Sequence, residues 1–259
     1  MKYALLLFIL SITLACNSKK ENNTQPETTT EIEDPAEEPR SYPVAFEKIL
    51  EAHGGLDNWK SYKTLQFTID KSPNTDETHT IDLQTRKDQI QMGAATMGFD
   101  GSQAWLTDPE ETYKGNPNFY HNLMFYFYAM PFVLADEGII YDATTDLVVK
   151  DVAYPGFKIS FEANVGSSSN DEYYLYYDSE TYKMRWLGYT ATFGAEEKSD
   201  AVNYIAYDNW TNVEDVLLPQ SISWYVVEND LLTEPRNTVS FKNSSLSKEA
   251  KPDTFYSKK

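Results

Sequence analysis

The chain has little cysteine and little histidine, and these shortages exclude several kinds of site. Cys16 is its one cysteine, so no disulfide forms within the chain. The three histidines, His53, His79 and His121, stand far apart, and none has a second histidine four residues away. We therefore predict no metal site, because zinc sites need clustered ligands and the acidic loops lack the spacing of an EF-hand.

Signatures of catalysis and of cofactor binding are also missing. The chain has no Gly-x-Ser-x-Gly run and no glycine-rich phosphate loop. Its 40 acidic residues make some carboxylate pair inevitable, so a pair by itself does not indicate a glycosidase. We expect no cofactor and no enzymatic activity, and a hydrolase of unknown substrate is one alternative.

Basic residues are outnumbered by acidic ones. With 22 Lys and Arg against 40 Asp and Glu, the formal net charge is −18. A surface of this charge repels nucleic acid and anionic lipid headgroups. We expect no nucleic-acid partner, and we expect attachment to a membrane through an anchor rather than through the protein surface.

The N-terminus carries a clear targeting signal. Lys2 precedes a short apolar run over residues 4–12, and Ala15 precedes Cys16. This order is typical of a secretory signal and resembles that of bacterial lipoproteins, in which the cysteine is lipidated and becomes the first mature residue. We predict a signal peptide over residues 1–15 and lipidation of Cys16. An ordinary signal peptide with an incidental cysteine is the alternative.

Residues 16–41 are rich in Thr, Glu, Asn and Pro, with Ile32 as their one bulky apolar side chain. Such a segment cannot bury enough apolar surface to fold, so we predict an acidic tether between a lipid anchor and a folded domain over residues 42–256. Asn17 follows the cysteine, where an aspartate would signal retention in the inner membrane. We predict an outer-membrane location and leave open whether the domain faces the periplasm or the cell surface.

Strand patterns dominate the domain. A helix is expected over residues 42–52, ended by His53, Gly54 and Gly55. Asp100 and Gly101 predict a hairpin between residues 94–99 and 102–107. Alternation of apolar and polar residues predicts the other strands. These lie near 65–69, 80–84 and 90–92, and over 146–152, 157–162, 172–178, 184–193, 202–211, 221–228 and 238–245.

Residues 115–142 form the most aromatic segment, and we expect the rest of the domain to be built around it. Asn116 and Pro117 are typical of a helix start and Pro131 interrupts the pattern, so we predict a short helix, with a buried strand as the alternative. The helix has almost no polar face, so it must be covered nearly all round by protein or by an apolar ligand. The ligand-binding residues that we predict are Phe125, Tyr126, Phe127, Met130, Phe132 and His121, together with Arg236.

Arg236 belongs to the run Thr-Glu-Pro-Arg, which we place between the last two strands. An arginine there could hold a ligand headgroup, and a structural ion pair or turn is the alternative. The tyrosines at positions 173, 174, 176 and 177 predict a strand with aromatic side chains on both faces.

The element order predicts a mainly β (α+β) fold, a strongly curved antiparallel sheet or half barrel of about 11 strands closed by two or three short helices. A two-sheet sandwich is the alternative. The run HGGLDNW after the first helix, followed by a series of antiparallel strands, resembles lipoprotein-sorting domains of the LolA/LolB type. More closely, a family of uncharacterised lipoproteins with that fold is resembled by the runs GNPNFYHN, FYFYAMPFVLADEGIIY, DEYYLYYD, WLGYT and TEPRNTV. The resemblance implies an apolar cavity, which takes acyl chains in the better-known relatives.

Our hypothesis from the sequence is an outer-membrane lipoprotein that binds a lipid or acyl chain beneath the aromatic helix. A surface module that binds glycan or protein is an alternative, and so is a structural envelope protein with a filled core. The sequence names no protein partner.

Overall fold

The structure is a computed structural model that describes residues 42–162, 171–191 and 201–259. The chain divides into a unit of residues Met1–Arg40 and a compact unit of residues Ser41–Lys259, which carries every element described below. The predicted signal peptide, Cys16 and the tether lie outside the described residues. None of the helices in the described ranges is long and apolar enough to cross a membrane.

Short helices occupy three places along the described chain. The first two are α1 (Val44–Ala52) and α2 (Leu56–Ser61). The middle group consists of α3 (Pro117–Tyr120), α4 (Leu123–Tyr128) and the 3-10 helix η1 (Phe132–Ala135), and η2 (Asp253–Phe255) lies near the C-terminus.

The strands before the middle helices are β1 (Thr64–Ile69), β2 (Glu77–Asp82), β3 (Asp88–Met92), β4 (Ala95–Phe99) and β5 (Ala104–Thr107). Those that follow are β6 (Ile139–Ala143), β7 (Leu147–Val149), β8 (Val152–Tyr154), β9 (Gly156–Phe161), β10 (Tyr173–Tyr177), β11 (Met184–Tyr189), β12 (Asn203–Val213), β13 (Val216–Glu228) and β14 (Leu231–Ser247). The hairpin predicted at Asp100 and Gly101 is confirmed, since β4 pairs antiparallel with β5.

In the described part of the chain, twelve strands form one sheet in the order β5-β4-β3-β2-β1-β14-β13-β12-β11-β10-β9-β6, and β7 pairs with β8 separately. Neighbouring strands run antiparallel. The predicted mainly β fold with one large antiparallel sheet is confirmed, and the sheet is open, with β5 and β6 at its two ends. The main additions are β6, which lies at the end of the aromatic segment, and β8, which follows β7 where the sequence pattern predicted a single strand.

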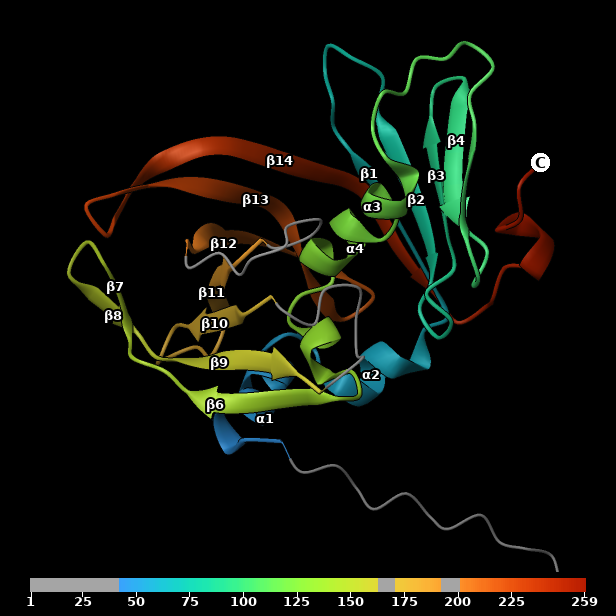
Figure 1. Ribbon diagram of the computed structural model, residues 1–259. Helices are drawn as coiled ribbons and strands as arrows, with labels where there is room; N and C mark the ends of the chain where they lie inside the picture. Colours follow the sequence, from blue (N-terminus) through green and yellow to red (C-terminus); the bar gives the residue numbers. More distant parts are fainter. Residues whose placement is uncertain (1–41, 163–170, 192–200) are drawn as a thin grey trace, which may run out of the picture. The chain divides into compact units, whose positions relative to one another are not determined.

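The sheet curves around the middle helices. Figure 1 shows β13 and β14 arching over α3 and α4, with β1 to β4 on one side and β6 and β9 to β12 on the other. Register shifts interrupt the β12–β13, β13–β14 and β1–β14 pairings. Because a bulge bends its strand and increases the local twist, these shifts help the long central strands to curve.

The main core fills the concave side of the sheet, where α1, α2, α4 and η1 pack against the strands.

The end of α1 is fixed by close backbone packing. Gly54 has φ +108°, and a Cβ there would lie 2.2 Å from the carbonyl oxygen of Asp215. His53 lies beside it, with Nδ1 2.7 Å from the carbonyl oxygen of Ile49.

The tyrosines of β10 divide between the two faces, as the period-2 pattern predicts. Tyr173 and Tyr177 pack against the main core, whereas Tyr174 and Tyr176 join a second cluster with Trp186 and Ala206.

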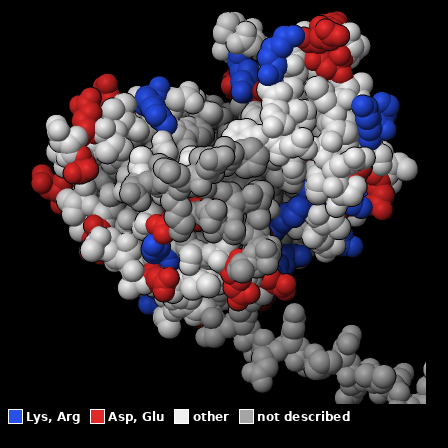
Figure 2. Space-filling view, in the orientation of Figure 1, with Lys and Arg blue, Asp and Glu red and all other residues white. Residues whose placement is uncertain are grey.

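Figure 2 shows the charged side chains on one face of the molecule. Among the described residues visible there, acidic and basic side chains are interspersed rather than gathered into a basic patch.

Candidate functional site

The aromatic segment is broken into three short helical pieces instead of the single helix that we predicted. Its start is as expected, because the Asn116 side chain accepts a hydrogen bond from the N–H of Asn118 at 3.0 Å and Pro117 opens α3. The break comes at Asn122, whose left-handed backbone has φ +58°. The segment bends there, and α4 then turns into the sheet.

Contacts with the β2–β3 region fix this break. Asn122 donates its main-chain N–H to Oδ2 of Asp88 at 2.8 Å, and its side-chain amide donates to the carbonyl oxygen of Arg86 at 2.8 Å. A helical N–H would instead point to the preceding turn of its own helix. Asparagine tolerates the left-handed conformation better than most residues, so this position can serve as the bend.

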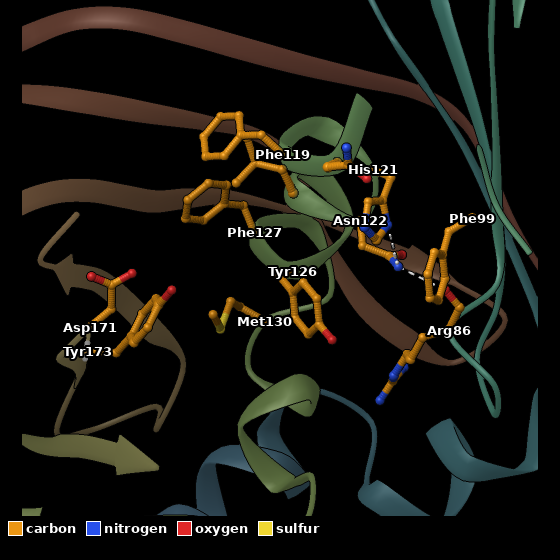
Figure 3. A pocket seen from close by; sticks show the side chains of 12 residues that line it. Arg86, Phe99, Phe119, His121, Asn122, Tyr126, Phe127, Met130, Asp171 and Tyr173 are labelled. Atoms are coloured by element: carbon orange, nitrogen blue, oxygen red, sulfur yellow. Dashed lines mark hydrogen bonds between the residues drawn. The ribbon is translucent and has the colours of Figure 1, made fainter. Parts of the chain in front are cut away.

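A pocket of about 280 Å³ lies beside these helices. Its walls come from α3 and α4, the β2–β3 turn, the end of β4 and the start of β10. The lining residues are Arg86, Phe99, Asn118, Phe119, His121, Asn122, Leu123, Tyr126, Phe127, Met130, Asp171 and Tyr173. Figure 3 shows Tyr126 and Met130 between Tyr173 on one side and Phe99 and Arg86 on the other.

The pocket wall is mostly aromatic and aliphatic. Phe119 and Tyr126 remain 43% and 41% exposed, whereas Phe127 and Met130 are buried. Phe127 is held from behind by the rings of Tyr189 and Trp224, at 5.4 and 5.7 Å between centroids. The pocket thus joins a rigid apolar floor to two exposed aromatic rings.

The pocket has one guanidinium. Nη2 of Arg86 donates to both carboxylate oxygens of Asp136 at 2.7 Å, and the guanidinium carbon lies 5.1 Å from the centre of the Phe125 ring. Nη1 is buried and has no hydrogen-bond partner among the described residues. One nitrogen of the guanidinium, Nη2, is therefore bonded to a carboxylate, whereas Nη1 is not.

Burial shifts the pKa of His121 and that of Asp88 in the direction that favours the neutral form of each. Burial lowers the pKa of His121, whose ring stacks on Phe99 with centroids 4.7 Å apart. Nδ1 of His121 lies 3.3 Å from the amide nitrogen of Asn122, which can only donate, so Nδ1 is the acceptor. Asp88 is 1% exposed, and burial raises its pKa to about 7 although the N–H groups of Asn122 and Phe99 oppose the shift.

The structure places the predicted site residues in three locations. His121, Tyr126, Phe127 and Met130 line the pocket. Phe125 and Phe132 lie in the core, where Phe132 stacks on Trp59 with centroids 4.7 Å apart. Arg236 is exposed on β14, with Nη2 3.3 Å from Oδ1 of Asn203, and is not among the lining residues.

The predicted placement of residues 233–236 between the last two strands is wrong, because these residues lie inside β14. The chain turns earlier, at Asn229 and Asp230, both of which have positive φ. Pro235 is tolerated because β1 pairs with β14 only from Phe241 onward, so Pro235 has one partner strand.

The sequence reading missed Arg86, Asp88, Phe99 and Asn122. Arg86 and Asp88 flank a strand start in a charged run, and nothing local distinguishes them from solvated residues. Asn122 was the one available signal, since it is a polar residue in an apolar segment. Among the described residues, no group of three or more His, Cys, Asp and Glu side chains could hold a metal ion.

A family profile described as a family of unknown function, DUF6503, matches residues 107–235. No curated protein matches the chain. The DUF6503 match spans the aromatic segment and the strands from β6 to the beginning of β14.

Solved structures offer distant likenesses. A DUF1329 family protein from Desulfovibrio piger has 6% identity and a TM-score of 0.45, covering 82% of this chain and 95% of its own. A LolA superfamily protein from Nitrosomonas europaea has 10% identity and a TM-score of 0.37, with coverages of 81% and 96%. A candidate outer membrane lipoprotein-sorting protein domain from Vibrio parahaemolyticus has 8% identity and a TM-score of 0.34, with coverages of 79% and 97%.

Proposed function

We propose that this protein binds an apolar ligand, a lipid or an acyl chain, in the pocket beside α3 and α4. The observation that carries the proposal is the lining itself, in which Phe127 and Met130 form a buried floor and Phe119 and Tyr126 stay exposed. Exposed aromatic rings beside an apolar cavity are costly in water, and a ligand that covers them recovers that free energy.

The size of the pocket limits the ligand. Small-molecule sites usually measure roughly 300–1,000 Å³, and this pocket of about 280 Å³ is at the lower end. One acyl chain suits it better than a lipid with several chains. Each buried methylene contributes about 0.8 kcal/mol, so binding should strengthen with chain length until the pocket is full.

The proposed role is binding rather than catalysis. The described lining holds no serine, threonine or cysteine that could act as a nucleophile, and its histidine stacks on Phe99. In the same proposal, the protein is exported, lipidated at Cys16 and held to the outer membrane by that anchor, with residues 16–41 as the tether.

The test is native mass spectrometry with organic extraction of the full-length protein carrying Cys16→Ser, purified without detergent. We expect co-purified lipid at a defined stoichiometry. Tyr126→Asp should abolish it, because a charge would enter the apolar wall. Val227→Asp is the matched control, since Val227 is 43% exposed on β13 and does not line the pocket.

An empty, stably folded protein would contradict the proposal. So would equal lipid occupancy in the Tyr126→Asp and Val227→Asp variants, because occupancy would then not depend on this wall.

A further inference from the structure

The guanidinium of Arg86 is held by two contacts. One face lies over the Phe125 ring, with the guanidinium carbon 5.1 Å from the ring centre, and Nη2 is bonded to Asp136. Stacking uses the face of a guanidinium and leaves its in-plane N–H groups available. Here the in-plane Nη1 is buried without a hydrogen-bond partner among the described residues.

An unpaired N–H of a buried cation is costly, because it has lost its hydrogen bonds to water. A ligand oxygen that accepted from Nη1 would recover this free energy, and a charged oxygen would recover more because the hydrogen bond is charge-assisted. Guanidinium can hold two oxyanions at once, one on each edge, so the Asp136 contact does not need to break.

The charges of the pocket give the ligand a direction. Figure 3 shows Arg86 on one side of the pocket and Asp171 on the other, beside Tyr173. Tyr126, Phe127 and Met130 line the wall as well. An anion would be attracted to the Arg86 side and repelled by Asp171, so its chain would extend from Arg86 along Tyr126 and Met130.

We propose that the ligand is a single-chain amphiphile with an anionic headgroup, a carboxylate or a phosphate monoester, and that Arg86 binds that headgroup. This inference rests on the proposed apolar binding and adds the headgroup class. It replaces Arg236, for which the sequence analysis considered this contact and which is not among the lining residues.

The test compares ligands that share one chain and differ in headgroup. Full-length Cys16→Ser protein is loaded with the uncharged fluorescent probe N-phenyl-1-naphthylamine, which is then displaced by dodecanoate, dodecyl phosphate, dodecanol or dodecyltrimethylammonium below their micellar concentrations. We expect the anions to displace the probe at concentrations about tenfold lower than dodecanol, as one charge-assisted hydrogen bond implies. The ratio of dodecanoate to dodecyl phosphate distinguishes the two headgroups.

Three variants locate the contact. Arg86→Met should remove the preference for anions over dodecanol, and Arg86→Lys should retain part of it. Arg236→Met should keep the full preference. Circular dichroism verifies that each variant is folded. The comparison of the four dodecyl headgroups with Arg86 in place does not depend on any of these variants.

Equal displacement by dodecanol and dodecanoate would overturn the headgroup assignment while leaving apolar binding intact. Loss of the preference in Arg236→Met but not in Arg86→Met would overturn it too. If neither the probe nor any dodecyl compound binds, the proposed function itself fails.

Discussion

The carboxylate of Asp88 accepts the main-chain N–H of Asn122 at 2.8 Å, and this bond joins the start of β3 to the break between α3 and α4. Through it, a buried acid on the sheet determines where the aromatic segment bends. The same contact makes the bend sensitive to protonation, because burial raises the pKa of Asp88 to about 7.

The contribution of Asp88 to the stability of the protein should therefore fall as pH rises toward 7. The ordinary pKa of Asp88 is 3.8 and its folded pKa is about 7. Between these values the folded state binds more protons than the unfolded state, so the free energy of unfolding decreases as pH rises, by at most about 1.4 kcal/mol per pH unit. Other groups titrate as well, so the measurement is the difference between wild type and Asp88→Asn in urea unfolding at pH 5 and pH 8.

Asp88→Asn should be at least as stable as wild type at pH 8. The new amide oxygen can accept the Asn122 N–H in place of the carboxylate, and the amide carries no charge that burial would penalise. A variant that keeps the wild-type difference between pH 5 and pH 8 would show that Asp88 does not titrate in this range.

Asn122→Ala should destabilise the protein more than Asn122→Gly. Both lose the bond to the Arg86 carbonyl, but only alanine also strains the backbone at φ +58°. That conformation costs roughly 1–2 kcal/mol for a residue with a Cβ, and glycine adopts it freely. Thermal unfolding of the two variants measures the difference, and equal midpoints would mean that the bend relaxes.

Tyr207→Phe should loosen α4 from the sheet. The fully buried hydroxyl of Tyr207 donates to the carbonyl oxygen of Phe127 at 2.8 Å, and its removal leaves a buried acceptor unpaired. The expected loss is roughly 1–3 kcal/mol in unfolding free energy. Tyr182→Phe on the more exposed loop before β11 is the control and should change it little; hydrogen exchange of α4 would locate the effect.

Gly54→Ala should be far more damaging than Gly55→Ala. Both glycines have positive φ, but a Cβ at Gly54 would lie 2.2 Å from the Asp215 carbonyl oxygen, whereas one at Gly55 meets nothing within 4 Å. We expect roughly 1–3 kcal/mol for Gly55→Ala from the backbone strain alone. Similar unfolding midpoints for the two variants would show that β12 and β13 shift to accommodate the methyl group.

The sequence by itself determined the class of fold. Alternating apolar residues such as Leu65, Phe67 and Ile69 predict a strand with one buried face, whichever strand it pairs with. Asp100 and Gly101 predict a hairpin turn at their own position. Both signals depend only on residues that are adjacent in the sequence. The start of α3 followed in the same way from Asn116 and Pro117. Four of the predicted site residues line the pocket. The aromatic segment has apolar side chains on nearly all sides, so part of it had to face either the core or an apolar pocket.

Only the tertiary structure decided which aromatic side chains face the pocket and which polar groups lie beside it. Phe125 and Tyr126 are adjacent in the sequence, yet one is core and the other is exposed, since the bend at Asn122 sets the rotation of α4. That bend depends on Asp88, which lies 34 residues away. Arg86 enters the site because β3 pairs beside β2 and places their turn against α4, a long-range relation that no local pattern contains.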